Sequence, residues 1–199
     1  RTGDGDQLHA YFTRTREIRR GIVEAGQDTD APNFGRGGRS ITVTDPGSPK
    51  IAQSLADFLT LEQMLAMSGL EYMTGILEGR TPSAPISRLM GFALNQVASG
   101  RIVFRGAPEF DTLNPLGTVH GGWYGTILDS AMACAVMTKL PKGSVYTTLE
   151  YKVNLIRAVP LGTLVDCIGE TDHVGRSTGV ASGRLVGVET GTLYATGST

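Results

Sequence analysis

The residues with the clearest chemical potential lie in one segment, NPLGTVHGGWYGTILDSAMACAVM, from Asn114 to Met137. Asp129 is the only charged side chain between His120 and Lys139, in a stretch that otherwise has the apolar spacing of a buried helix. An ionised carboxylate without a partner in such surroundings costs several kcal/mol or takes a raised pKa. A contact with a backbone amide of a neighbouring loop would be a purely structural explanation. We favour a carboxylate that faces a ligand and acts as a base or a nucleophile.

The start of this predicted helix carries a second feature, the sequence His120-Gly121-Gly122. The first amides of a helix have no intrahelical acceptor, and with the helix dipole they can bind an oxygen that gains negative charge. Glycines also let a substrate approach the backbone closely. A plain turn would explain the two glycines taken alone, but their position ahead of Asp129 favours an oxyanion-binding site.

The spacing of these two features has a consequence for assembly. Gly121 and Asp129 are eight residues apart, which along one α-helix is about 12 Å. An oxyanion donor and an attacking base must both lie within about 3–3.5 Å of the reacting group. One chain cannot arrange this, whereas two chains with antiparallel helices can, each supplying Gly121 to one site and Asp129 to the other. If the pair is catalytic, we therefore expect a symmetric dimer with two shared sites.

The composition indicates one domain with an apolar core. The chain has 199 residues, 40% of them hydrophobic, and a formal net charge of -1, which argues against binding to nucleic acid. No stretch approaches the ~20 apolar residues that a membrane span needs. Two cysteines are too few for a disulfide framework, so we expect a reducing, cytoplasmic environment. The three histidines lack the spacing of zinc ligands, so no metal is expected.

Two regions of the chain differ in composition. Residues 1–53 are predicted to be an N-terminal extension and linker, with a helix over Gln7–Glu24 followed by a polar stretch rich in Gly and Pro. Residues 54–199 are predicted to form the main domain. At its start, Thr60 can cap one helix that continues through LEQMLAMSGLEYMTGILEG and ends at Gly79.

The remaining elements predict an α+β fold. A hairpin turns around Ala98-Ser99-Gly100, and the apolar helix described above follows it. Helices and strands do not alternate as they do in βαβ units, and a helix that is apolar on nearly all sides is a buried one. We therefore predict an antiparallel sheet of five to six strands wrapped around one long central helix, with extra N-terminal helices. The last four strands are expected at Ser144–Arg157, Thr163–Val174, Ser177–Val188 and Thr192–Ser198.

The motif N-P-x-G-x-x-H-G-G-x6-D resembles that of the hotdog-fold acyl-CoA thioesterases of the PaaI type, from the phenylacetic-acid pathway. The later segment LPKGSVYTTLEYKVNLIRAVPLGT is similar to the same family, and the resemblance extends from about Ser54 to the C-terminus. It implies a hotdog-fold homodimer, often paired again as a dimer of dimers into a homotetramer. It also implies hydrolysis of acyl-CoA thioesters without a metal or other cofactor, coenzyme A being part of the substrate.

The resemblance also assigns roles to individual residues. Asp129 would be the nucleophile or general base, and the Gly121 amide, aided by His120, would polarise the thioester carbonyl. Asn114 would help to place the carbonyl or the water. Thr148 would orient the water, although a shift of one residue would give this role to Thr147, because the loop before it varies in length among relatives.

Coenzyme A brings phosphate groups, and the candidates to meet them are Arg157, Arg176 and Lys142. Any one of them taken alone could equally be a solvated surface charge. Arg176 is favoured because Gly175 exposes backbone amides beside it. The full set of residues expected to bind the substrate is Gly122, Thr147, Arg157, Gly175, Arg176 and Ser177.

Three alternative functions have some support in the sequence. A non-catalytic acyl-CoA-binding hotdog protein is the main rival to an enzyme. A hotdog hydratase is weaker, because its Asp-x4-His spacing occurs here only at Asp4 and His9, in a polar tail. The serine-hydrolase pattern GRSTG at Gly175–Gly179 is rejected, because strand residues follow it and no later His completes a triad.

The acyl group of the substrate is expected to be aryl or medium-chain. Residues that could line its pocket, although packing in the core would explain them as well, are Met64, Met67, Leu70, Met90, Trp123 and Tyr124.

Overall fold

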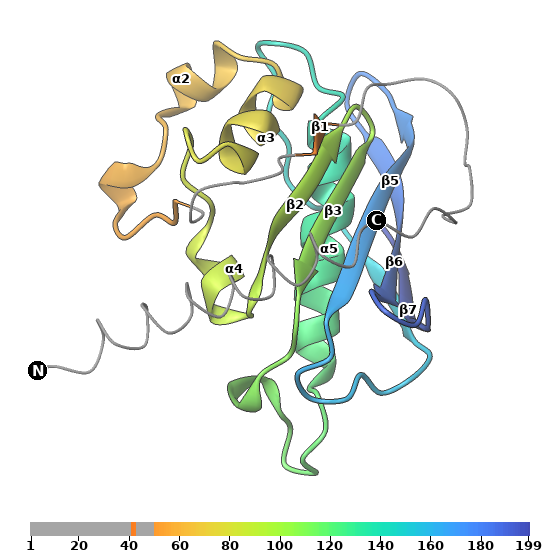
Figure 1. Cartoon of the computed structure of the whole chain (residues 1–199). Helices are drawn as coiled ribbons and strands as arrows, with labels where there is room; N and C mark the ends of the chain where they lie inside the picture. Colours follow the sequence, from red (N-terminus) through yellow and green to blue (C-terminus); the bar gives the residue numbers. More distant parts are fainter. Residues whose placement is uncertain (1–40, 43–49) are drawn as a thin grey trace, which may run out of the picture.

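A computed structural model describes residues 41–42 and 50–199 (Figure 1). In this part of the chain, an antiparallel sheet with the strand order β1-β2-β3-β5-β6-β7-β4 packs against helix α5, as predicted. The two-residue β1 adds a seventh strand to the six of the main sheet. The strands are β1 (Ile41–Thr42), β2 (Phe92–Ala98), β3 (Arg101–Gly106), β4 (Lys152–Leu155), β5 (Val165–Val174), β6 (Gly179–Gly187) and β7 (Leu193–Ser198). The helices are η1 (Leu55–Asp57), α2 (Leu61–Leu65), α3 (Gly69–Leu77), α4 (Pro85–Leu89), η2 (Phe110–Thr112) and α5 (Gly121–Met137).

Three glycines on neighbouring strands let α5 lie unusually close to the sheet. Gly169 of β5, Gly183 of β6 and Gly197 of β7 are register partners in one row across the sheet. A Cβ atom at Gly169 would overlap the carbonyl oxygen of Ala131, and one at Gly183 would lie 2.7 Å from Cγ of Met132. The middle of α5 is therefore held against the strand backbones, and this fixes the helix that carries Asp129.

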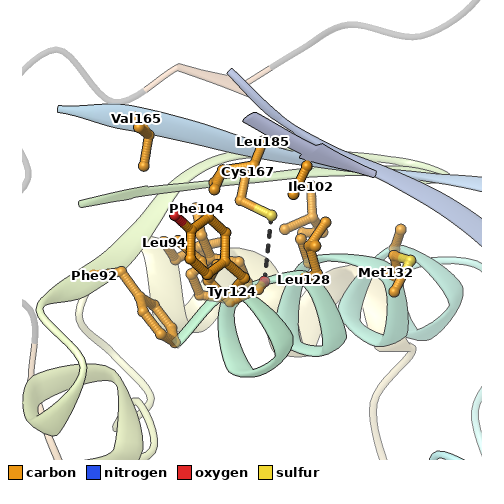
Figure 2. Close-up of a cluster of buried hydrophobic side chains, with 14 of the residues drawn as sticks. Phe92, Leu94, Ile102, Phe104, Tyr124, Leu128, Met132, Val165, Cys167 and Leu185 are labelled. Atoms are coloured by element: carbon orange, nitrogen blue, oxygen red, sulfur yellow. Dashed lines mark hydrogen bonds between the residues drawn. The ribbon is translucent and has the colours of Figure 1, made fainter. Parts of the chain in front are cut away.

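The core fills the space between the inner face of the sheet and α5 (Figure 2). Leu128 and Met132 of α5 are fully buried, and the Cys167 thiol of β5 donates to the carbonyl of Ile127 at 3.4 Å. Each large apolar side chain buried in this way contributes about 1.5–3 kcal/mol. Together these contacts fix which side of α5 faces the sheet and which side carries its polar residues.

The prediction of one continuous helix up to Gly79 is wrong, because the chain forms α2 and α3 instead. Thr60 does cap α2, accepting from the Gln63 amide at 3.2 Å. A second capping box then starts α3, in which the Glu71 carboxylate accepts from the Ser68 amide at 2.7 Å. Gly69 packs so closely on the last turn of α5 that a Cβ would overlap the Met137 carbonyl. A straight helix could not make both contacts. The predicted stop holds, since Gly79 has a φ of +75°.

The hairpin is confirmed, with Ser99 and Gly100 joining β2 to β3 and Gly100 at a φ of +79°. The short helix α4, which begins at Pro85, was not predicted. Figure 1 shows α3 and α4 beside β2 and α2 beyond α3, with α3 near one end of α5.

The long strand predicted over Ser144–Arg157 is wrong in extent, because only β4 is a strand. Pairing of β4 with β7 runs from Leu155 to Lys152. Lys152 pairs with Ser198, the last residue of β7, so the residues before Lys152 have no strand partner on that side, and Thr148 contacts Asp129 of α5. The other three predicted strands are present, each shorter by two residues or fewer at either end. The predicted helix over Gln7–Glu24 lies outside the described residues, and the domain boundary at residue 54 stays a prediction.

Candidate active site

Residues 146–155 run antiparallel to α5 along the side of the helix that carries Asp129. Side-chain contacts connect the two segments at four levels, from the C-terminal end of α5 to its start. They are Cys134 with Tyr146, Asp129 with Thr148, Gly125 with Tyr151, and Gly121 with Leu155. The sequence-predicted base and oxyanion donor therefore lie on one flank of α5, covered by the same segment.

Asp129 is half-buried in the third turn of α5 and accepts a hydrogen bond from the Thr148 hydroxyl at 2.9 Å. The structural alternative, a contact with a backbone amide, does not occur among the described residues. Of the two neighbouring threonines it is Thr148 that meets the carboxylate, while Thr147 is exposed. One hydroxyl leaves the carboxylate oxygens with free acceptor sites for water or substrate.

The two glycines at the start of α5 differ in the hydrogen bonds of their amides. The imidazole Nδ1 of His120 accepts from the Gly122 amide at 2.9 Å, and the His120 carbonyl accepts from the Trp123 amide at 3.0 Å. Gly121 is then the first-turn residue whose N–H finds no acceptor in the described part of the chain. Because Nδ1 accepts, the neutral imidazole carries its proton on Nε2, which makes Nε2–H a second donor at this end of the helix.

The two glycines also differ in the space around them. A Cβ at Gly122 would lie 3.0 Å from Nδ1 of His120 and would crowd the cap. A Cβ at Gly121 would meet only Cδ1 of Leu155, at an ordinary 3.5 Å. The described chain therefore explains the missing side chain at Gly122 but not the one at Gly121, which suits close approach by a ligand or by a second chain.

The side chain of Asn114 holds the loop that leads into α5. Its Oδ1 accepts from the Leu116 amide at 2.9 Å and from the Thr118 amide at 3.3 Å, and its Nδ2 donates to the Thr118 hydroxyl at 2.8 Å. Such an Asx turn fixes the path of the chain toward Gly121. One Nδ2 hydrogen remains for a substrate, so the predicted role of Asn114 toward the carbonyl or the water stays a prediction.

The residues predicted to bind coenzyme A do not form one cluster within the chain. Gly175, Arg176 and Ser177 lie in the turn between β5 and β6, beside the C-terminal half of α5, because a Cβ at the adjoining Gly179 would lie 2.5 Å from Val136. In contrast, Arg157 lies by the N-terminal half of α5. The Tyr124 hydroxyl there donates to the Arg157 carbonyl at 3.5 Å and accepts from the Val159 amide at 2.8 Å.

The positions of several residues decide between the roles predicted for them. Ser177 stands in a turn between two strands, so it cannot be the nucleophile of a serine-hydrolase elbow, which needs a following helix. Trp123 is only 1% exposed, with its indole N–H donating to the Met90 carbonyl at 2.8 Å, and Tyr124 is buried beside it, so both serve the core. Among the described residues, no three His, Cys, Asp or Glu side chains gather as metal ligands would. No helix in the same residues is long and apolar enough to cross a membrane.

Sequence reasoning missed a cluster next to Asp129. The Cys134 thiol lies 3.6 Å from the Tyr146 hydroxyl, and Tyr72 of α3 is close enough to influence the ionisation of both. Burial raises the pKa of Cys134 to about 11, and the charge of Asp129 adds to this rise. The distance of Cys134 from Asp129, about one and a half helical turns, was a weak signal for its proximity. Nothing local in the sequence connects Tyr72 to either residue.

Comparisons with known proteins identify the same region of the chain. The sequence model of the thioesterase superfamily matches residues 116–193, which include His120, Gly121, Asp129 and Thr148. No curated protein shows significant sequence similarity to the chain.

Solved structures of similar fold give a consistent result. A thioesterase-like, phenylacetic acid degradation-related protein of Ralstonia eutropha is 26% identical, with a TM-score of 0.58 over 64% of this chain and 96% of its own. A conserved protein of Pseudomonas aeruginosa is 28% identical, with a TM-score of 0.54 over 58% and 90% of the two chains. The PaaI protein of Escherichia coli is 19% identical, with a TM-score of 0.52 over 57% and 79%, which shows a shared fold. The hotdog fold and the resemblance to PaaI-type thioesterases are thereby confirmed.

Proposed function

We propose that the chain, whose residues 116–193 match the thioesterase superfamily, is an acyl-CoA thioesterase with active sites shared between two copies. The superfamily match and the hotdog neighbours support a thioester hydrolase. Acyl-CoA as the substrate class comes from the resemblance to PaaI-type enzymes. The observation that carries the proposal is the arrangement of α5, with an acceptor-free Gly121 amide at its start and the Thr148-bonded Asp129 two turns later.

The distance between these groups requires a second copy. Gly121 and Asp129 are separated by about 12 Å along α5, too far for both to contact one carbonyl group. If two copies lie with their α5 helices antiparallel, Gly121 of one copy can face Asp129 of the other, and the two-fold symmetry creates two equal sites.

The edge of the sheet supports such a pairing. β4 is the outermost strand, and among the described residues nothing pairs with its free side. Apolar side chains on and before it are exposed, with Leu149 at 82%, Leu155 at 55% and Tyr151 at 48%. Open edges with exposed apolar side chains are rare in stable monomers. We propose a homodimer formed along this edge, with a further pairing into a dimer of dimers.

The same pairing would unite the residues proposed to bind coenzyme A. Arg157 lies near the start of α5, whereas Arg176 lies near its end. In an antiparallel pair, Arg157 of one copy would approach Arg176 of the other, so both charges could serve one substrate. Each guanidinium can hold a phosphate through two hydrogen bonds.

The chemistry follows from these groups. The Asp129 carboxylate takes a proton from a water molecule held by Thr148, and the water oxygen attacks the thioester carbonyl carbon; direct attack by the carboxylate is the alternative. The oxygen that becomes negative accepts from the Gly121 amide and from Nε2–H of His120 of the second copy. The C–S bond then breaks and the proton passes to the sulfur. A thiol pKa of about 8.5 makes the thiolate a good leaving group, so no strong general acid is needed.

The test is steady-state hydrolysis of a panel of acyl-CoA thioesters, with thiol release as the readout. Loss of a positioned general base lowers the rate about 10²–10⁴-fold, and we expect Asp129→Asn to do so while its melting temperature stays near that of the wild type. The Asn keeps the size of the side chain and can still bond to Thr148. Equal, slow thiol release by both proteins would instead favour the non-catalytic acyl-CoA-binding alternative.

A further inference from the structure

Three polar side chains lie together on one side of Asp129, and we refer to them as the Tyr72–Cys134–Tyr146 cluster. Cys134 follows Asp129 on α5, Tyr146 precedes Thr148 in the covering segment, and Tyr72 comes from α3. The Cys134 thiol and the Tyr146 hydroxyl are 3.6 Å apart. The cluster therefore joins three segments of the chain at the C-terminal side of the candidate base.

The cluster is uncharged at neutral pH. Burial raises the pKa of Cys134 to about 11. Tyr146 is 39% exposed as a whole, but its hydroxyl end is covered, which raises its pKa, followed by the effects of Cys134 and Asp129. Tyr72 shifts in the same direction, because of its own burial and of Cys134. This side of Asp129 thus presents aromatic rings and protonated groups, surroundings that suit an apolar ligand.

Helix α3 is held firmly in place behind the cluster. The Gly69 amide at its start donates to the Leu140 carbonyl at 3.0 Å, and just before α3 the Gly143 amide donates at 2.9 Å to the carbonyl of Leu65, the last residue of α2. The absence of a Cβ at Gly69 lets α3 touch the last turn of α5. α3 lies outside residues 116–193, so this wall is an addition to the part of the chain that the thioesterase superfamily model matches.

The opposite side of Asp129 has a different character. There Tyr151 covers Gly125, with its hydroxyl 3.2 Å from the place of a Cβ. Beyond it lie Leu155, which is 55% exposed, and the positive end of the α5 dipole at Gly121. This side leads to the Gly121 amide and to the proposed dimer edge, so it suits the polar part of the thioester rather than an acyl chain.

We propose that the acyl group of the substrate extends from Asp129 toward the Tyr72–Cys134–Tyr146 cluster, where Tyr146 and Tyr72 limit the acyl length that the site accepts. The inference rests on the proposed thioesterase function, which puts the reacting carbonyl at Asp129. Cys134 lies about 7.5 Å beyond Asp129 along the helix axis, a length comparable to an aryl or medium-chain acyl group. The site thereby selects such groups over long fatty acyl chains.

The test uses binding, so that it does not depend on hydrolysis. Butyl-, octyl- and dodecyl-CoA thioethers, which lack the carbonyl and cannot be hydrolysed, are titrated calorimetrically into the full chain. We expect the wild type to bind the octyl compound better than the dodecyl one. Tyr146→Ala should raise the dodecyl-to-butyl affinity ratio about tenfold, the effect of roughly two more buried methylene groups. Tyr72→Ala should raise it less, because Asp129 influences the pKa of Tyr146, whereas the pKa of Tyr72 responds to its burial and to Cys134.

Two matched variants sharpen the result. Tyr146→Phe keeps the ring and loses only the hydroxyl, so it should keep the wild-type ratio. Tyr151→Ala removes the same kind of side chain on the other side of Asp129 and should also keep that ratio. A ratio that rises in Tyr151→Ala but not in Tyr146→Ala would overturn the inference, since the acyl group would then run toward Gly121. A melting temperature for each variant shows whether a change in ratio reflects loss of folding.

Hydrolysis of the corresponding acyl-CoA thioesters is measured in parallel. If the wild type binds the thioethers but releases no thiol, the proposed function fails, and the binding ratios still decide the acyl direction. If thiol release occurs and the ratios are equal in all variants, only the inference fails. If the wild type binds no thioether, the inference is overturned, and if it also releases no thiol, the proposed function is overturned with it.

Discussion

The side of α5 that faces the sheet and the side that faces residues 146–155 differ in how closely they are packed. Toward the sheet, the helix is packed without space, since Leu128 and Met132 are fully buried and Gly183 has no room for a Cβ. Toward residues 146–155, α5 carries polar or small residues. About one side chain of that segment contacts each turn of the helix. On that side, Gly121 has space for a side chain that it lacks.

This difference separates stability from chemistry along one helix. Close packing toward the sheet fixes the position of every residue on α5, because a packed core does not deform continuously. The other side can then hold a carboxylate and an acceptor-free amide at small cost to the fold. Substitutions toward the sheet should therefore lower stability, whereas substitutions on the other side should lower activity at nearly constant stability.

The largest expected effect in this comparison comes from removing the Gly121 amide. Gly121→Pro deletes the N–H at the first helical position, where proline is well tolerated, and His120 already has a ψ of 139° that suits a residue before proline. We expect kcat for acyl-CoA hydrolysis to fall about 10²–10³-fold, as for the loss of an oxyanion donor. Gly121→Ala keeps the amide and is the control, with a much smaller loss.

The same variant tests whether the site is shared. Gly121→Pro and Asp129→Asn chains, each nearly inactive alone, are unfolded and refolded together in equal amounts. Random pairing makes half of the dimers mixed, and each mixed dimer has one intact site of two, so about a quarter of wild-type activity should return. If the mixture is no more active than the two proteins measured separately, each site lies within a single chain.

On the sheet side of α5, substitutions of Gly169, Gly183 and Gly197 should lower the free energy of unfolding. Gly183→Ala places a methyl group against Met132 and should lower the free energy of unfolding by about 1–3 kcal/mol, a typical cost of overpacking. Gly197→Ala should cost less, because its nearest contact is the flexible end of Met132 at 3.0 Å, and Gly169→Ala more, because it meets backbone. Urea unfolding gives the order, and an equal stability of all three would contradict the close approach of α5.

Parts of this arrangement were accessible from the sequence because their signals are local. The apolar spacing of α5, the capping residue Thr60 and the turn at Ser99-Gly100 each depend on neighbouring residues, so these elements were predicted well. The motif from Asn114 to Asp129 placed the candidate amide and base on one helix. The N-P-x-G sequence at Asn114 is typical of a turn, and the Asx turn found there agrees with it.

Other parts depend on partners that are distant in the sequence. The break between α2 and α3 occurs where Gly69 meets the end of α5, and β4 is short because its partner β7 ends at Ser198, opposite Lys152. A pattern of alternating apolar residues cannot reveal either event. Only the path of residues 146–151 shows that Thr148, and not Thr147, contacts Asp129. Tyr72 lies near the site because α3 packs there, which the sequence around Tyr72 does not indicate.

A smaller effect on activity is expected at Thr148. Thr148→Val keeps the branched shape and removes the hydroxyl that donates to Asp129 at 2.9 Å. A hydrogen bond to a charged group is worth about 1.5–3 kcal/mol, so kcat should fall roughly 10–100-fold if the full bond contributes to the transition state. Thr147→Val, at the exposed neighbour, should lose only a small part of this. Equal losses in both variants would mean that the contact with Asp129 does not order the site.

The last expected effect is confined to high pH, where the stability should depend on Cys134. Burial raises the pKa of this thiol to about 11 in the folded chain, above the value of about 8.5 for a free cysteine. Between these values the unfolded chain loses the proton while the folded chain keeps it, so the contribution to stability is complete below about pH 8.5 and is lost as the pH rises toward 11. Cys134→Ala removes this group, and its free energy of unfolding should fall less steeply than that of the wild type over the same range. Parallel curves for the two proteins would show that the thiol is as accessible to solvent when folded as when unfolded, which would contradict a covered cluster beyond Asp129.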